Sequence, residues 1–87
     1  MKNPIYAEIV QNIRNKISSG QLKPGDDLPS ETSLCSEYNT SRMTVRKGLS
    51  ILSNEGYIYS IPGKGYFVKK PNYNKYIFVY DEMNNLI

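Results

Sequence analysis

Residues 28–47 have the sequence LPSETSLCSEYNTSRMTVRK, and this stretch decides the fold. It predicts two short helices separated by a polar turn, each opening on a hydroxyl side chain that can cap its first turn. The second helix begins with hydroxyl and cationic groups, while its apolar side chains fall on another face: Val45, Leu49 and Leu52. Such a helix can be held to a core by its apolar stripe while its N-terminal half enters the major groove of DNA.

A further helix is expected before this stretch. Asn3 and Pro4 suit an N-cap and a first helical position, and Gly20 is suited to end the helix. Between them isoleucines recur every four residues and form an amphipathic stripe: Ile5, Ile9, Ile13 and Ile17. The connector at residues 22–29 is rich in turn signals, because it contains Pro24, Gly25 and Pro29.

After Gly56 the hydrophobic period changes. Residues 57–61 and 66–68 are typical of two strands joined by a tight glycine turn at 62–65. Three helices followed by a two-stranded β-hairpin make an α+β fold, the winged helix-turn-helix, over residues 1–70. Residues 71–87 are expected to form a linker and a strand at 75–80, which either begins a second, effector or dimerisation domain or pairs with another chain.

Composition narrows the function classes. The 87 residues fit one small domain, and with one cysteine and no histidine the sequence predicts no disulfide, no metal site, no cofactor and no common general base. No apolar run is long enough to span a bilayer, so a cytoplasmic protein without membrane contact is expected. Residues 39–70 hold six lysines and arginines against Glu55 alone, a net charge of +5, which is typical of a polyanion partner or of a solvated basic face.

Five DNA contacts are predicted on the third helix. Arg42 and Arg46 lie four residues apart on one face, and a guanidinium can donate two hydrogen bonds to guanine. The alternative for both is a phosphate contact or a surface ion pair. Ser41 and Thr44 can bond phosphate or base, although Ser41 can also serve simply as the cap. Lys47 either touches phosphate or is solvated.

Four more contacts are predicted outside that helix. Ser30 begins the preceding helix, where free N–H groups favour a phosphate, or it acts only as an N-cap. Gly63, Lys64 and Gly65 form the tip of the hairpin. Two glycines let the backbone approach a narrow minor groove, whose negative potential would attract Lys64. The alternative is an ordinary hairpin turn.

These residues resemble the DNA-binding domain of the GntR family of bacterial transcription regulators over about residues 4–68. The strings that carry the resemblance are Pro24-Gly25-Asp26, Leu28-Pro29-Ser30-Glu31, Ser41-Arg42, Thr44-Val45-Arg46, Gly56-Tyr57, Gly63-Lys64-Gly65 and Phe67-Val68. The resemblance implies a homodimeric repressor that binds a palindromic operator in double-stranded DNA. It also implies a small-molecule effector bound by a downstream domain not present here, and the strand at 75–80 is more similar to the HutC-like branch.

The sequence departs from the family pattern at four positions. Thr32 stands where the family usually has arginine, so one operator contact is expected to be weakened or lost. Lys47 replaces an acidic residue, Gly48 a small alanine, and Cys35 an alanine.

Two other classes of function compete with DNA binding. A winged-helix protein–protein interaction module would use the basic face for an acidic partner. An enzyme would need a nucleophile–base pair or a phosphate-binding loop, neither of which the sequence offers.

Overall fold

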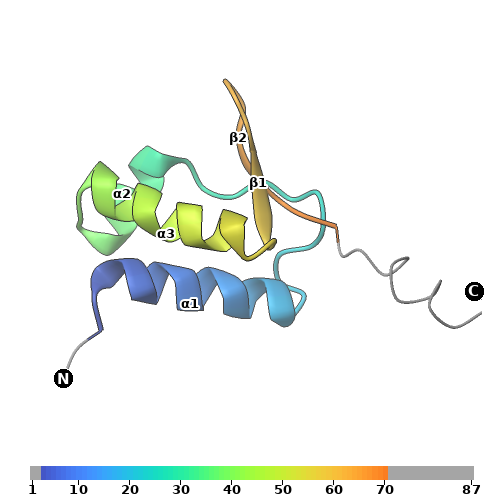
Figure 1. Cartoon of the computed structure of the whole chain (residues 1–87), viewed down its shortest axis with the longest axis horizontal. Coiled ribbons are helices and arrows are strands. Elements are labelled where there is room, and N and C mark those ends of the chain that lie inside the picture. Colours follow the sequence, from blue (N-terminus) through green and yellow to red (C-terminus); the bar gives the residue numbers. More distant parts are fainter. Residues whose placement is uncertain (1–2, 71–87) are drawn as a thin grey trace, which may run out of the picture.

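The computed structural model describes residues 3–70, which form three helices and a hairpin (Figure 1). The elements, in chain order, are α1 (Ile5–Ser18), α2 (Glu31–Tyr38), α3 (Arg42–Asn54), β1 (Ile58–Ile61) and β2 (Gly65–Val68). The predicted α+β winged helix-turn-helix is therefore confirmed. The linker and strand predicted within residues 71–87 lie outside the described residues.

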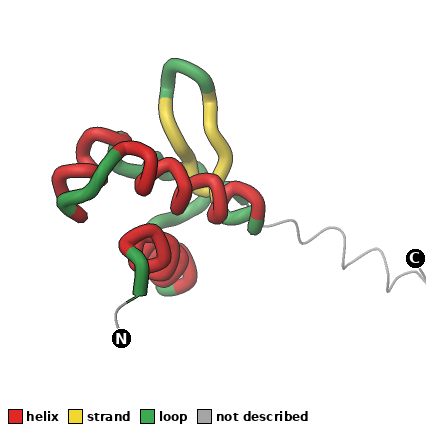
Figure 2. Tube along the Cα trace, turned by 60° about the vertical axis from the view of Figure 1, so that its left-hand side comes forward, coloured by secondary structure: helices red, strands yellow, loops and turns green. Residues whose placement is uncertain are grey.

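The hairpin projects away from the layer of helices (Figure 2). Its two strands are antiparallel, with Ile58 opposite Val68 and Ile61 opposite Gly65. Only the base of the hairpin is buried, at Ile58 and Val68, so the tip is free to reach beyond the body of the domain.

The core joins all five elements. Its centre is the apolar face of α3, packed between α1, α2 and the base of the hairpin. The buried side chains are Ile9, Val10, Ile13, Leu28, Leu34, Val45, Leu49, Leu52, Ile58 and Val68. The predicted stripes of α1 and α3 both contribute, because their four-residue and three-residue spacings keep these side chains on one face of each helix.

One predicted helix boundary is wrong. Asn3 does not cap α1: the N-cap is Pro4, and it makes no side-chain hydrogen bond. The carbonyl of Pro4 instead accepts hydrogen bonds from the N–H groups of Ala7 and Glu8. Proline can occupy this position because it requires no N–H partner at a helix start.

The connector at residues 22–29, between α1 and α2, pairs with β2. Asp27 forms an isolated antiparallel bridge with Phe67. The N–H of Leu28 donates to the carbonyl of Tyr66 at 2.9 Å, and the N–H of Val68 donates to the carbonyl of Asp26 at 2.8 Å. The connector therefore covers the free edge of β2 and attaches the hairpin to the start of α2, a role that its turn-rich sequence did not predict.

Gly48 lies on α3 where it packs directly against α1. A Cβ added there would lie 3.2 Å from Cγ2 of Ile9 and 3.3 Å from the backbone oxygen of Tyr6. The glycine that costs helix propensity thus allows the two helices to pack closely.

Gly48→Ala is consequently expected to destabilise the fold despite the better helix former. The methyl group contributes about 1 kcal/mol of helix propensity, but overpacking costs about 1–3 kcal/mol, so the free energy of unfolding should fall by about 1 kcal/mol. Urea unfolding followed by circular dichroism measures the change. Ser50→Ala, at an exposed position of the same helix, is the control and should raise stability slightly. A gain for Gly48→Ala equal to that control would contradict the packing argument.

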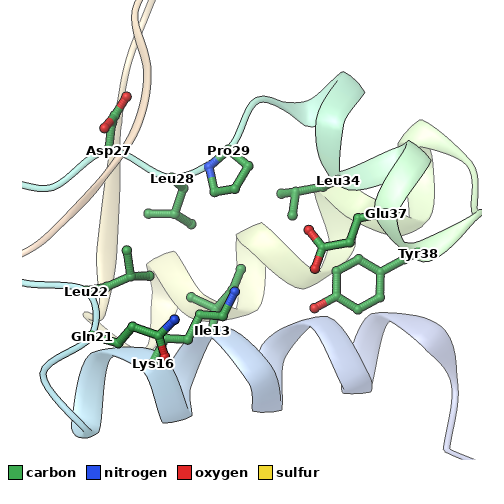
Figure 3. Close-up of a pocket in the computed structure, with 10 residues that line it drawn as sticks. All are labelled: Ile13, Lys16, Gln21, Leu22, Asp27, Leu28, Pro29, Leu34, Glu37 and Tyr38. Carbon is green, nitrogen blue, oxygen red and sulfur yellow. The ribbon is translucent and has the colours of Figure 1, made fainter.

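A hollow of about 380 Å³ opens between α1, α2 and the connector (Figure 3). Apolar core side chains form part of its wall, and charged groups such as Lys16 and Glu37 also line it. None of the predicted DNA-contact residues lines this hollow.

In the described part of the chain, no helix is both long and apolar enough to cross a membrane.

Candidate nucleic-acid interface

Two serine caps start the helices of the predicted motif. Oγ of Ser30 accepts from the N–H of Ser33 at 3.0 Å, and Oγ of Ser41 accepts from the N–H of Thr44 at 3.2 Å. The hydroxyls of Ser41 and Thr44 also lie 3.0 Å apart. The capping role of both serines is thereby confirmed, and contact with DNA stays a prediction for both.

The turn between α2 and α3 depends on Asn39, which has a left-handed backbone with φ 51°. Asparagine tolerates this conformation better than most residues. The N–H of Thr40 then bonds back to the carbonyl of Cys35 at 3.1 Å, which closes the end of α2. This tight turn brings the N-terminus of α3 next to the N-terminal part of α2.

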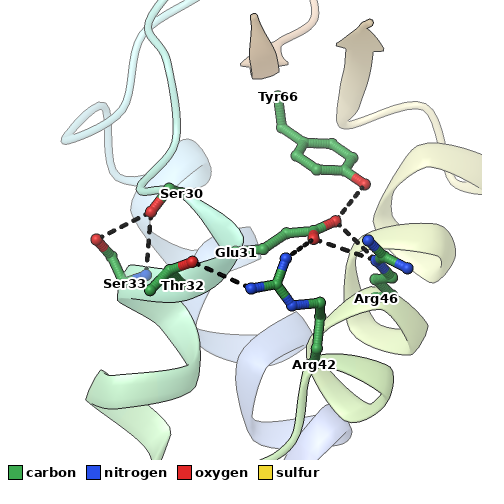
Figure 4. A network of polar contacts seen from close by, with 7 residues as sticks. All are labelled: Ser30, Glu31, Thr32, Ser33, Arg42, Arg46 and Tyr66. Atoms are coloured by element: carbon green, nitrogen blue, oxygen red, sulfur yellow. Dashed lines mark hydrogen bonds and ion pairs between the residues drawn. The ribbon is translucent and has the colours of Figure 1, made fainter. Parts of the chain in front are cut away.

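Glu31, the first residue of α2, joins α2, α3 and the hairpin (Figure 4). Its two carboxylate oxygens each accept from Nε of Arg46 at 3.1 Å. Oε1 also lies 3.5 Å from Nη1 of Arg42, and Oε2 accepts from the hydroxyl of Tyr66 at 3.3 Å. One carboxylate therefore holds both predicted recognition arginines and a residue of β2.

The two arginines stay on the surface. Their side chains are 56% exposed for Arg42 and 60% exposed for Arg46, whereas that of Glu31 is 18% exposed. Nη2 of Arg42 donates to the hydroxyl of Thr32 at 3.3 Å. Thr32, at the position where the sequence predicted a lost operator contact, thus helps to position Arg42.

The tip of the hairpin is a tight turn. The N–H of Lys64 donates to the carbonyl of Ile61 at 2.9 Å, and Gly63 has φ 80°. Proline at the second position and glycine with positive φ at the third are typical of a type II turn. The sequence Pro62-Gly63 therefore explains the turn, and Lys64 is exposed at the tip.

The arginine cluster, which is Arg42 and Arg46 with their shared partner Glu31, is connected to the tip through Glu31. A hollow of about 380 Å³ is lined by Glu31 and Tyr66 together with the tip residues Gly63, Lys64 and Gly65. The structure thus links five of the nine predicted site residues through Glu31: Arg42 and Arg46 pair with its carboxylate, and Gly63, Lys64 and Gly65 line the hollow that it also lines. Ser30 caps α2, and Ser41, beside Thr44, caps α3. Lys47 differs, because its Nζ lies 4.1 Å from the ring centroid of Tyr6, over α1.

The contacts of Glu31 with Arg42, Arg46 and Tyr66 change the pKa of its carboxyl group. The hydrogen bond from Arg46 holds the pKa of Glu31 below its usual value, and this effect exceeds the opposing effect of burial. Burial, followed by the nearby Glu31 charge, raises the pKa of Tyr66. At neutral pH the cluster therefore contains an ionised carboxylate, two guanidinium groups and a neutral phenol.

This lowered pKa predicts a pH-dependent contribution to stability. Because Glu31 is more acidic in the folded chain, its contribution is fully present above the ordinary glutamate pKa of about 4.3 and is lost as the pH falls through the lower folded value. The difference in unfolding free energy between the wild type and Glu31→Gln should be largest at neutral pH and shrink in acid. Urea unfolding of both chains at several pH values measures it, and a pH-independent difference would contradict the role of the charge.

Sequence reasoning missed Glu31 and Tyr66 as parts of the site. An acidic first helical residue is ordinarily explained by the helix dipole, and a tyrosine in a strand by packing. The only available signal was the placement of an acid directly after the Ser30 cap, ahead of a cationic helix.

Among residues 3–70, no group of three histidine, cysteine, aspartate or glutamate side chains is placed to hold a metal ion.

Comparison with known proteins gives a family match. The model of bacterial regulatory proteins of the gntR family matches residues 5–68. The chain is 46% identical over 68 residues to the HTH-type transcriptional repressor NagR of Bacillus subtilis, covering 78% of this chain and 28% of that protein. It is 44% identical over 75 residues to the mannosyl-D-glycerate transport/metabolism system repressor MngR of Escherichia coli, covering 86% of this chain and 31% of that protein. The chain thus spans about a third of the length of these relatives.

The fold has close counterparts among solved structures. A structure of the AraR DNA-binding domain in complex with operator ORR3 has a TM-score of 0.76 and 34% sequence identity. The match covers 78% of this chain and 82% of that one.

Proposed function

This chain belongs to the GntR family of bacterial regulatory proteins, and we propose that it binds a specific operator in double-stranded DNA and acts as a transcriptional repressor. The observation that supports this function best is the link that Glu31 makes between the arginine cluster and the hairpin tip. Glu31 pairs with the exposed guanidinium groups of α3, and the same residue lines the hollow that the lysine at the glycine turn also lines. Two relatives are repressors and a structural neighbour is a DNA-binding domain in complex with an operator, which favours DNA over a protein partner.

In this mechanism the N-terminal half of α3 enters the major groove. Arg42 and Arg46 meet base edges or phosphates, and Ser41 and Thr44 lie at the same end of the helix. Ser30 and the first N–H groups of α2 meet a phosphate beside the groove. Lys47 adds cationic charge at the side of α3 that faces α1.

The hairpin enters the adjoining minor groove. Gly63 and Gly65 have no side chain to obstruct the approach, and nothing lies within 4 Å of a Cβ built at either position. Lys64 at the tip is attracted by the negative potential of a narrow groove. Contact at both grooves would span more of the duplex than α3 alone.

The repressor acts as a homodimer. Two copies related by a two-fold axis address half-sites about one helical turn apart, so the operator is palindromic. A small-molecule effector would bind a domain downstream of this unit, residues 1–70; the relatives are about three times as long as this chain. Binding to chromosomal DNA would place the protein in the cytoplasm.

Selection of bound sites from random duplex DNA tests this function. The 87-residue chain should enrich a short motif, and a duplex carrying that motif should bind more tightly than a scrambled one. Affinity for both should fall steeply between about 50 and 200 mM salt, since phosphate contacts release counterions. Equal affinity for every duplex, or affinity that does not respond to salt, would contradict the proposal.

A further inference from the structure

The contacts of Arg46 with Glu31 involve one edge of the guanidinium. Nε donates to both oxygens of Glu31, and within residues 3–70 no hydrogen bond engages the two Nη groups of Arg46. The Nη groups are the outer end of the side chain, and together they can donate to O6 and N7 of a guanine. Glu31 therefore holds the arginine by its inner edge and leaves its outer end available.

Arg42 is held differently. Its Nη1 atom lies 3.5 Å from Oε1 of Glu31, and its Nη2 atom donates to the hydroxyl of Thr32 at 3.3 Å. A phosphate that takes Arg42 must compete with both partners. The carboxylate also repels phosphate directly, because it lies on the surface that would face the DNA backbone.

We propose that Glu31 is a positioning residue that sets the sequence specificity of α3. Its carboxylate presents Arg46 end-on to a base edge, and it weakens the sequence-independent attraction of both arginines for phosphate. The hydroxyl of Tyr66 fixes the second oxygen of the same carboxylate and so links the orientation of the arginines to the hairpin. This inference rests on the proposed function.

An acid at a DNA-facing surface has an effect opposite to that of a simple binding residue. Removing it should strengthen binding to any duplex, since a guanidinium released from Glu31 is free to pair with a phosphate. At the same time it should weaken discrimination, since Arg46 loses the partner that orients it. A residue with only a structural role would lower both affinities together.

Glu31→Gln is the test variant, because glutamine has the same size and no charge. Its affinity, and that of the wild type, is measured by fluorescence anisotropy on the selected operator duplex and on a scrambled duplex, over a range of salt. Glu31→Gln should bind the scrambled duplex more tightly than the wild type does. For this variant the slope of log affinity against log salt should also steepen by about 1. The ratio of operator to scrambled affinity should fall about tenfold.

Glu37→Gln is the matched control. Glu37 is on the same helix, is exposed, and belongs to no ion pair within the described residues, so its replacement changes the net charge equally. It should leave the affinity ratio unchanged. Equal ratios for Glu31→Gln and Glu37→Gln would overturn the inference.

Tyr66→Phe provides a second variant that keeps every charge. It removes only the hydroxyl that donates to Glu31, so the affinity ratio should fall by about threefold to fivefold, the loss of one hydrogen bond, while the salt slope stays at the wild-type value. An unchanged ratio here would also count against the inference. If the wild type itself shows no preference for any duplex, the proposed function fails; if it shows one and Glu31→Gln keeps it, only the inference fails.

Discussion

Arg46→Ala is expected to lower affinity for the selected operator by about tenfold or more per half-site, because a bidentate arginine–guanine contact is worth about 1–3 kcal/mol. In a palindromic site the loss occurs twice. The substitution also leaves Glu31 with only the more distant Arg42 as a cationic partner, so its carboxylate repels the DNA more strongly. Anisotropy titrations on operator and scrambled duplexes measure the effect, and the operator should lose more.

Arg14→Ala is the matched control for this prediction. Arg14 lies on α1, where it pairs with Glu55 at 2.7 Å and lies 5.7 Å from the ring centroid of Tyr57. Its loss removes the same charge away from the arginine cluster, so operator affinity should change little. Adding Arg42→Ala to Arg46→Ala should reduce operator binding to the level of the scrambled duplex. Unchanged operator affinity in the double variant would contradict the assignment of α3 as the recognition helix.

Leu49→Ala is expected to have the largest effect on stability. Leu49 is 0% exposed and lies on the face of α3 that packs into the core. Truncating a buried leucine costs about 2–5 kcal/mol, and the total stability of a small domain is about 5–15 kcal/mol. The variant should therefore unfold at a much lower urea concentration, as followed by circular dichroism.

Met43→Ala serves as the control on the same helix. Met43 is 83% exposed, so truncating its side chain should change the free energy of unfolding by less than about 0.5 kcal/mol. A loss for Leu49→Ala as small as that of the control would mean that α3 does not anchor the core.

Most of the fold could be predicted because its signals are local. The N-caps at Ser30 and Ser41 and the turn at Pro62-Gly63 each depend on hydrogen bonds between residues no more than three or four apart. The start of α1 was wrong by one residue: Asn3 and Pro4 suit an N-cap and a first helical position in isolation, but the helix begins at Ile5. The pairing of the connector with β2 was missed because Asp27 and Phe67 are far apart in the sequence.

The sequence by itself determined the order of the elements and the two faces of α3, since the period of apolar and polar residues assigns each side chain to the core or to solvent. Only the tertiary structure decided what holds the recognition arginines. Glu31 and Arg46 are 15 residues apart, on different helices, and Tyr66 reaches the same carboxylate from a strand. Such contacts depend on the angle at which α2, α3 and the hairpin pack. The periodicity of apolar residues in a sequence does not indicate packing angles.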